Sequence, residues 1–337
     1  MVYRSRRPIH CPRQTPKHWL KAVQQLRGRF PHWGAKKIHA RLRRCHPRAR
    51  LPAVRTLTKW LHRMGPVRRQ RHTRRGPSLA LPPLTRPQKP NDVWTVDYKG
   101  YFRTTDGTRV YPLTVRDLFS RFILGVRILP DQRQSLARAA FLRLFCQHGL
   151  PKIIRVDNGS PFGNTGAAGL SRLSLWWTTL GIQVEFIRPG HPEENGAHEQ
   201  MHRELKRDTA RRPKARPPAQ QQHTNQWVRH YNYLRPHEAL GGRCPADLYF
   251  KSRRRYRGPR PIRYPRGWIV RQVRSNGQIK WQGRKRSVGE AFVGQAVALR
   301  RKASQIYQVR FMHLPLGLLH DKDSGGIHPS KHYRQNK

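Results

Sequence analysis

The spacing of apolar residues changes near residue 91 of this 337-residue chain. Before this point apolar residues recur every three or four positions, which is the spacing of helices that bury one face. After it, apolar and polar residues alternate, as in Val93-Trp94-Thr95-Val96-Asp97-Tyr98, and this is the period of a strand. A single helical bundle would show only the helix pattern, and a single β-sandwich would show only the strand pattern, whereas this chain carries each pattern in a separate segment. We therefore expect several domains of different class.

Three short helical patterns occupy residues 1–65, which we interpret as a helix-turn-helix DNA-binding domain. The third helix is predicted to begin at Pro52 and to bury a stripe made of Val54, Leu57 and Leu61. Residues outside this stripe would be available to a DNA groove. These candidate DNA-binding residues are Arg55, Thr56, Thr58 and Lys59. The alternative is a helical spacer that contacts only phosphates.

The segments on either side of the central region have their own composition. Residues 66–90 are rich in arginine and proline, which predicts an extended basic linker. Residues 251–325 contain short alternating runs, and Asn276-Gly277 between two of them is a strong signal for a β-hairpin. We expect a small DNA-binding β-barrel there, followed by a disordered tail at residues 326–337.

Residues 91–250 show three strand patterns and then alternating helices and strands. This order is typical of an α/β domain with a mixed sheet, as in a ribonuclease-H-like core, and we expect it to end in a helical extension. The predicted strands are 93–98, 110–115, 122–128, 152–156 and 184–187.

The charge of the chain indicates its partner. There are 70 Lys and Arg residues against 17 Asp and Glu, a formal net charge of +53. Such a chain repels itself unless a polyanion neutralises it, so nucleic acid is the expected partner. No apolar run is long enough for a membrane span, and we expect a cytoplasmic, nucleoid-associated protein without a membrane partner. The four cysteines form no CxxC pair, so we expect neither a disulfide framework nor a zinc ribbon.

Because carboxylates are rare here, their positions are informative. Asp97 lies within a predicted strand, Asp157 ends another strand, and Glu199 lies on a predicted helix. These elements can bring the three side chains together at one rim of the sheet. Carboxylate oxygens suit Mg²⁺ or Mn²⁺, and two such ions can clamp the attacking and leaving oxygens of a phosphoryl transfer. Taken singly, each residue is more simply a turn residue or a solvated charge.

Four segments of the core resemble the catalytic core of bacterial insertion-sequence transposases of the retroviral-integrase type. They are Trp94–Tyr98, Asp117–Arg121, Val156–Phe162 and Arg188–Glu199. Outside the core, Trp33–Ile38 is similar to the helix-turn-helix of that family, and Tyr231–Leu240 is similar to its post-core stretch. The resemblance covers roughly residues 16–320. It implies a ribonuclease-H-like fold, an Asp-Asp-Glu metal triad formed by Asp97, Asp157 and Glu199, and multimeric assembly on the ends of a mobile element.

The third carboxylate has alternatives. Forty-one residues separate Asp157 from Glu199, more than is typical of retroviral integrases, and the glycine-rich segment 163–169 can absorb the difference as a loop. The other candidates are Glu193, Glu194 and Glu204. Arg203 and Lys206 would share the helix face of Glu199 and could bind substrate phosphate.

The expected reaction is metal-dependent hydrolysis of a phosphodiester at the element end, which leaves a 3′-OH that attacks target DNA directly. Such a protein is expected to act as a homo-oligomer on element terminal repeats and target DNA. The alternatives are a metal-dependent nuclease that only cuts and a non-catalytic DNA-binding protein derived from a transposase.

Overall fold

The computed structural model describes residues 15–65, 84–164, 166–188, 196–259, 261–322 and 325–328. Contacts divide the chain into two compact units. The smaller unit joins Met1–Ala80 with Tyr231–Asp247, and the larger one joins Leu81–His230 with Leu248–Lys337. No helix in the described ranges is both long and apolar enough to cross a bilayer.

The smaller unit contains the three predicted helices, α1 (Lys17–Arg29), α2 (Ala35–Cys45) and α3 (Val54–Arg63). Each contributes two apolar side chains at helical spacing to a common core. These side chains are Trp19, Val23, Ile38, Leu42, Leu57 and Leu61. Helix α3 begins at Val54, two residues later than the predicted start at Pro52.

The segment Tyr231–Asp247 belongs to this same unit, whereas the sequence suggested that it extends the core. It contains the short helices η5 (Glu238–Leu240) and η6 (Pro245–Asp247). Glu238 pairs with Lys36 of α2, and Asp247 Oδ2 lies 2.5 Å from Arg44 Nη1. Because ion pairs between residues distant in sequence form only after folding, the sequence pattern did not reveal this placement.

The larger unit contains a mixed sheet with the strand order β2-β3-β1-β5-β6, and β4 pairs with β3. Strand β3 is antiparallel to both β1 and β4, so these three strands form a meander. Strand β5 lies between β1 and β6 and is parallel to both. The bounds are β1 (Val93–Tyr98), β2 (Phe102–Arg103), β3 (Arg109–Asp117), β4 (Ile123–Leu129), β5 (Ile153–Val156) and β6 (Gln183–Phe186). The predicted mixed α/β sheet is therefore confirmed.

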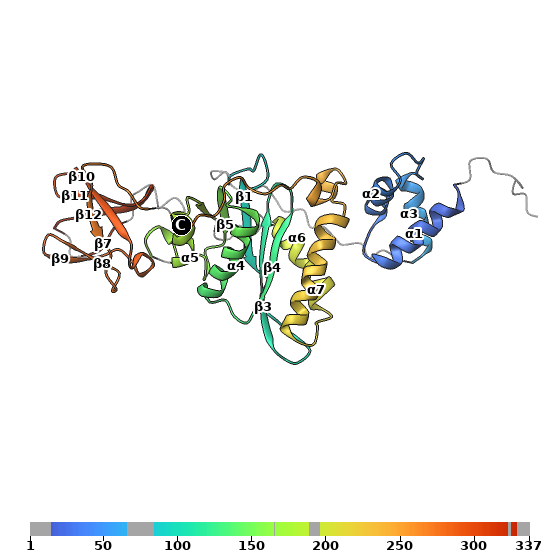
Figure 1. Ribbon diagram of the computed structural model, residues 1–337, viewed down its shortest axis with the longest axis horizontal. Coiled ribbons are helices and arrows are strands. Elements are labelled where there is room, and N and C mark those ends of the chain that lie inside the picture. Colours follow the sequence, from blue (N-terminus) through green and yellow to red (C-terminus); the bar gives the residue numbers. More distant parts are fainter. Residues whose placement is uncertain are drawn as a thin grey trace, which may run out of the picture. The chain divides into compact units, whose positions relative to one another are not determined.

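Helices cover both faces of this sheet, which explains why β1 is buried on both sides (Figure 1). On one face Trp94 stacks on Phe145 at 5.9 Å between ring centroids, and Phe145 comes from α4 (Gln134–His148). α5 (Arg172–Thr179) also covers this face, with Trp177 against Phe141 of α4. On the other face lie α6 (Gly196–Leu205), its continuation η3 (Lys206–Ala210) and α7 (Pro217–Arg229).

Helix α7 also protects the outer edge of β4. The amide of Gln221 accepts a hydrogen bond from Ile128 N at 2.8 Å and donates one to Val126 O at 2.9 Å. These two backbone groups face away from β3 and would otherwise be open to strand addition. One side chain thus blocks further pairing at this edge.

The C-terminal region contains a four-stranded antiparallel sheet in the order β12-β11-β10-β7 and a separate pair β8-β9. Its strands are β7 (Ile269–Gln272), β8 (Gln278–Trp281), β9 (Arg284–Ser287), β10 (Ala296–Ala303), β11 (Ile306–Phe311) and β12 (Leu314–His320).

The hairpin predicted around Asn276-Gly277 is wrong in its pairing. A tight turn is present, with Gly277 at φ +74° and Arg274 N donating to Gln278 O. However, β7 pairs with β10, and β8 pairs with β9 through a turn at Gln282-Gly283, where both residues have positive φ. The second turn has the backbone of a two-residue hairpin, and it pairs β8 with the strand that follows rather than with β7.

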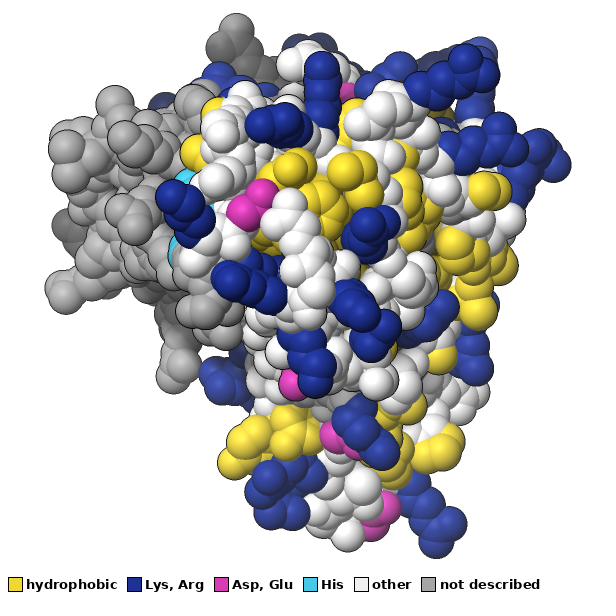
Figure 2. Space-filling view, turned by 90° about the vertical axis from the view of Figure 1, so that its left-hand side faces the viewer, with side chains coloured by type: hydrophobic (Ala, Val, Ile, Leu, Met, Phe, Trp, Pro, Cys, Tyr) yellow, Lys and Arg dark blue, Asp and Glu magenta, His cyan; other side chains and the backbone are white. Residues whose placement is uncertain are grey.

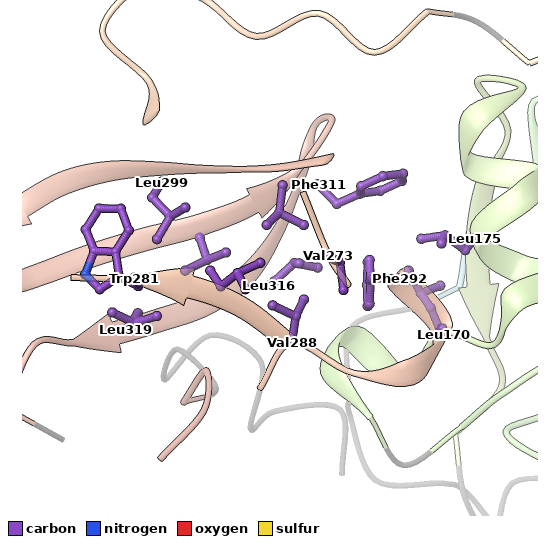
Figure 3. Packing of buried hydrophobic residues seen from close by; sticks show 14 residues of the cluster. Leu170, Leu175, Val273, Trp281, Val288, Phe292, Leu299, Phe311, Leu316 and Leu319 are labelled. Carbon is purple, nitrogen blue, oxygen red and sulfur yellow. The ribbon is translucent and has the colours of Figure 1, made fainter. Parts of the chain in front are cut away.

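The C-terminal strands share a hydrophobic core with the end of the mixed-sheet domain. Leu170 and Leu175 lie beside Phe292 of η7 (Glu290–Phe292), and the same cluster includes Val273, Phe311 and, at its far end, Trp281 (Figure 3). Leu170 follows η1 (Ala167–Gly169), which belongs to the glycine-rich segment 163–169. The glycine-rich segment between Asp157 and Glu199 is therefore followed directly by Leu170, which packs against the C-terminal strands.

The predicted tail is ordered at its start. His328 exchanges two backbone hydrogen bonds of 2.8 Å with Leu318, and Ile327 N donates to Ser287 O at 3.2 Å. His328 thus forms an isolated bridge to Leu318 of β12, and Ile327 bonds to Ser287 of β9, at the start of the segment predicted to be disordered. Residues 329–337 and most of the predicted linker, 66–83, lie outside the described residues.

Candidate active site

Asp97 lies on the central strand of the mixed sheet, and Asp157 directly follows the neighbouring parallel strand. In the register of β1 and β5, Thr95 is paired with Arg155. Both aspartates come two residues later in their strands, on the same face of the sheet. Adjacent strands are about 4.8 Å apart, so this register brings the two carboxylates to one end of the sheet.

The turn after β5 holds Asp157 in place. Asn158 Nδ2 donates to Ile187 O at 2.6 Å, and Gly163 N donates to Gly159 O at 2.9 Å. Gly163 approaches so closely that a Cβ there would lie 2.4 Å from the carbonyl oxygen of Asn158. The turn therefore requires a glycine at position 163.

Glu199 lies in the first turn of α6, on the sheet face that also carries Asp97, and its side chain is exposed. Of the alternative third carboxylates, Glu204 lies on α6 but is buried, with an exposed fraction of 9%. Glu193 and Glu194 lie outside the described residues.

The surroundings of Asp97 and Asp157 disfavour their charged forms. Burial raises the pKa of Asp97 to about 7, and the negative charges of Asp157 and Glu199 contribute to this rise. A hydrogen bond from the Tyr98 backbone and the charge of Lys99 act in the opposite direction. Burial also raises the pKa of the Asp157 carboxyl, against a hydrogen bond from Gly159 N. The ionisation of Asp97 and of Asp157 is thus unfavourable in the absence of a cation.

Among the described residues, no three His, Cys, Asp or Glu side chains lie close enough together to form a closed metal-ligand group. The donor chemistry nevertheless fits a divalent ion. Asp97, Asp157 and Glu199 offer carboxylate oxygens, which Mg²⁺ and Mn²⁺ prefer, and a cation there would offset the repulsion that raises the pKa of Asp97.

Three known family models match parts of the chain. Residues 87–192 and 180–245 each match a family model described as an integrase core domain. Residues 269–320 match the C-terminal domain of IS481 family transposases. The central region of the chain is thus similar to integrase core domains, and its C-terminal region is similar to that of IS481 family transposases. The resemblance inferred from the sequence is thereby confirmed.

Relatives of this integrase core occur in bacteria and in retroviruses. The transposase for insertion sequence element IS904 of Lactococcus lactis is 29% identical over 186 residues, which are 52% of this chain and 70% of the relative. An uncharacterized protein of insertion element IS476 from Xanthomonas euvesicatoria is 29% identical over 188 residues, or 54% of this chain and 51% of the relative. The Pro-Pol polyprotein of simian foamy virus type 3 is 31% identical over 134 residues, or 39% of this chain and 11% of the polyprotein. The chain thus spans only about half the length of some relatives.

Solved structures with a similar arrangement include the magnesium complex of the HTLV-2 integrase catalytic core domain. Its sequence identity is 17% and its TM-score 0.39, with 49% of this chain and all of that chain covered. A simian T-cell lymphotropic virus intasome in complex with a PP2A regulatory subunit has 18% identity and a TM-score of 0.43, with 88% and 98% covered.

The predicted DNA-binding residues of this integrase-type chain lie in two places. On α3, Arg55 and Lys59 are exposed, Thr56 is half-buried, and Thr58 donates its hydroxyl to Val54 O at 2.9 Å. Arg203 is exposed on α6. Lys206 is exposed at the start of η3, where the helix changes to π-type spacing, so the assumed α-helical spacing does not extend to it.

Sequence reasoning missed three polar residues of the integrase core, namely Thr114, His198 and His202. All three are buried, and the Thr114 hydroxyl lies 2.6 Å from His198 Nε2 and 2.7 Å from His202 Nε2. His202 Nδ1 lies 3.7 Å from Asp97 Oδ2. The available signal was the spacing of the two histidines, four residues apart around Glu199, which places both on one helix face.

Proposed function

We propose that this chain is a metal-dependent DNA transposase that cleaves DNA at the ends of a mobile element and joins the freed 3′-OH to target DNA. The observation that carries the proposal is the β1–β5 register, which brings Asp97 and Asp157 to one end of the sheet beneath the helix that carries Glu199. After burial, the charges of Asp157 and Glu199 both contribute to the raised pKa of Asp97. Residues from a strand, a strand end and a helix thus share one electrostatic neighbourhood, as phosphoryl transfer with divalent ions requires.

Asp97, Asp157 and Glu199 are the residues that would hold Mg²⁺ or Mn²⁺, in our proposal as two ions. When bound, such ions supply activation of the attacking oxygen and stabilisation of charge on the phosphate. The chain orients these ligands through the β1–β5 register and the turn closed at Gly163. In the joining step, a bond forms between the 3′-oxygen and a target phosphorus while the target strand's own P–O3′ bond breaks. No covalent intermediate with the protein is needed.

DNA is the proposed partner. On α6 and at its end, Arg203 and Lys206 are exposed and are suited to bind substrate phosphate. On α3, Arg55 and Lys59 are suited to contact element ends. Residues 261–322 carry thirteen Lys and Arg against two acidic residues, and basic side chains are widespread on the face drawn in Figure 2. We expect this region, which we propose to be a small barrel, to bind DNA with little sequence preference.

Assembly as a homo-oligomer on DNA and a cytoplasmic, nucleoid-associated location belong to the same proposal. Two element ends must be joined to one target in a coordinated way, which a single active site cannot do alone.

The experiment is strand cleavage and joining on a duplex that carries the DNA flanking the gene, with Mg²⁺, with Mn²⁺ and with chelator. Asp97→Asn, Asp157→Asn and Glu199→Gln each remove one anionic ligand at nearly constant shape. We expect each to lose at least about 100-fold in cleavage and joining, because removing one transition-state interaction typically has such an effect. DNA binding should persist in all three.

Glu193→Gln, Glu194→Gln and Glu204→Gln are the matched controls and should keep most activity. If Glu199→Gln stays active while one of these controls is inactive, the third carboxylate is misassigned. Activity that survives chelation would refute the metal dependence. Cleavage without joining, when target DNA and a preformed 3′-OH are supplied, would identify a nuclease. Binding to DNA without either reaction would identify a non-catalytic DNA-binding protein.

A further inference from the structure

A buried hydrogen-bond network connects α6 to the strand that carries Asp97. Its centre is Thr114 of β3, which is directly opposite Asp97 in the β1–β3 register and is fully buried. The Thr114 hydroxyl donates to Asp97 O at 2.8 Å and contacts His198 Nε2 at 2.6 Å and His202 Nε2 at 2.7 Å. A single hydroxyl therefore joins two strands and one helix.

The direction of each hydrogen bond follows from the number of protons available. A threonine hydroxyl has one hydrogen to donate and two lone pairs that can accept. The Asp97 carbonyl can only accept, so the hydroxyl hydrogen points to it, and both imidazoles must donate from Nε2 to the Thr114 oxygen. His198 Nδ1 then accepts from the Thr95 hydroxyl at 2.9 Å. All donors and acceptors of the Thr114 hydroxyl are used.

This network constrains the rotation of α6. The other buried contacts of the helix toward the interior include Met201 and Leu205, which are apolar. Apolar contact is non-directional, so it tolerates rotation and sliding of a helix more readily than hydrogen bonds do. His198 and His202 are four residues apart and share one face. Glu199 lies between them in sequence at the margin of that face, so its position depends on the same rotation.

We infer that Thr114, His198 and His202 are positioning residues that set the rotation of α6 and so hold Glu199 next to Asp97. This inference rests on the proposed function, because it assumes that these two carboxylates bind metal together. It adds residues that do not touch substrate but determine how strongly the carboxylates bind a divalent ion.

The test compares Thr114→Val with Thr114→Ser. Valine keeps the shape of threonine but leaves both imidazole donors without their acceptor, whereas serine keeps the hydroxyl. The matched control is Thr224→Val on α7, which removes an equally buried hydroxyl that donates to Gln220 O of its own helix at 2.8 Å. Each full-length variant is titrated with Mn²⁺ alone while its unfolding temperature is measured, and the Mg²⁺ dependence of DNA cleavage is recorded separately.

For Thr114→Val we expect the Mn²⁺ concentration that gives half of the full rise in Tm to increase about tenfold, which is typical when an outer partner of a metal ligand is lost. The Mg²⁺ concentration for half-maximal cleavage should rise in parallel. Thr114→Ser should stay within about threefold of the original protein, and Thr224→Val should not change the metal requirement even if it lowers Tm.

A folded Thr114→Val variant with an unchanged metal requirement would overturn the inference and leave the proposed function intact. If Thr114→Val does not fold, Thr95→Val decides in the same assay, because it removes only the hydroxyl that bonds His198 Nδ1. A raised metal requirement in Thr95→Val supports the network, and an unchanged one refutes it. Failure of the proposed function has a different signature in the original protein. Without a metal site it would neither cleave DNA nor gain stability from Mn²⁺, and as a nuclease it would cleave DNA without joining it.

Discussion

Asp97 on β1 and Asp157 directly after β5 stand at equivalent positions of two neighbouring parallel strands, each two residues beyond the pair Thr95 and Arg155. The consequence is electrostatic, because the charge of Asp157 contributes to the raised pKa of Asp97, after burial. The same closeness that makes the two groups useful as joint metal ligands makes the metal-free site unfavourable at neutral pH.

The first prediction concerns stability against pH in the absence of metal. The folded Asp97 carboxyl keeps its proton up to about pH 7, whereas the unfolded chain releases it near pH 4. Between these values the folded state binds more protons, so this group lowers the free energy of unfolding as pH rises. Asp97→Asn cannot ionise. It should therefore stabilise the metal-free protein by on the order of 1–3 kcal/mol at pH 8 relative to pH 4.

Urea unfolding with chelator at both pH values measures this difference. If Asp97→Asn raises the free energy of unfolding equally at pH 4 and at pH 8, ionisation of Asp97 does not destabilise the folded protein. Addition of Mg²⁺ should stabilise the original protein at pH 8 more than it stabilises Asp97→Asn.

The second prediction concerns the turn that carries Asp157. In Gly163→Ala the new Cβ would meet the carbonyl oxygen of Asn158, which is backbone and cannot rotate away. We expect a loss of about 1–3 kcal/mol in the free energy of unfolding, the usual effect of overpacking, together with a strong loss of cleavage. Gly166→Ala is the control, because a Cβ at that position would meet no atom within 4 Å. Chemical denaturation and the cleavage assay should separate the two variants, and equal behaviour would contradict the steric argument.

The third prediction concerns salt. A chain with a formal charge of +53 should release many counterions when it binds DNA. If six to ten phosphates are contacted, affinity should fall by about 10³–10⁵ between roughly 50 and 200 mM salt. Fluorescence anisotropy with a labelled duplex measures the slope. A flat response would refute the role assigned to the basic residues.

The fourth prediction concerns α3. Arg55 and Lys59 are exposed on this helix, so Arg55→Ala and Lys59→Ala should weaken binding to the element end, by about 1–3 kcal/mol where a base contact is lost. Lys21→Ala on α1 removes the same charge from another exposed position and should reduce affinity only slightly and for every sequence. Competition between element-end DNA and unrelated DNA measures the difference. Equal loss of affinity for both DNAs in all variants would favour a helix that contacts only phosphates.

The sequence by itself determined most helices and strands of this protein and their order along the chain. The period of apolar residues is a local property, and it correctly predicted α1 to α3, the meander β1-β3-β4 and the later strands β5 and β6. It also singled out Asp97, Asp157 and Glu199, because carboxylates are scarce in so basic a chain.

Only the tertiary structure decided contacts between residues distant in sequence. Pairing of β7 with β10, the ion pair between Arg44 and Asp247, and the placement of Tyr231–Asp247 with the N-terminal helices all depend on which partners meet after folding. The same is true of Thr114, which lies 84 residues from His198 in sequence. From the sequence alone, Thr114 is an ordinary strand residue. A buried hydroxyl must find hydrogen-bond partners wherever the fold supplies them, and no local pattern encodes which ones these are.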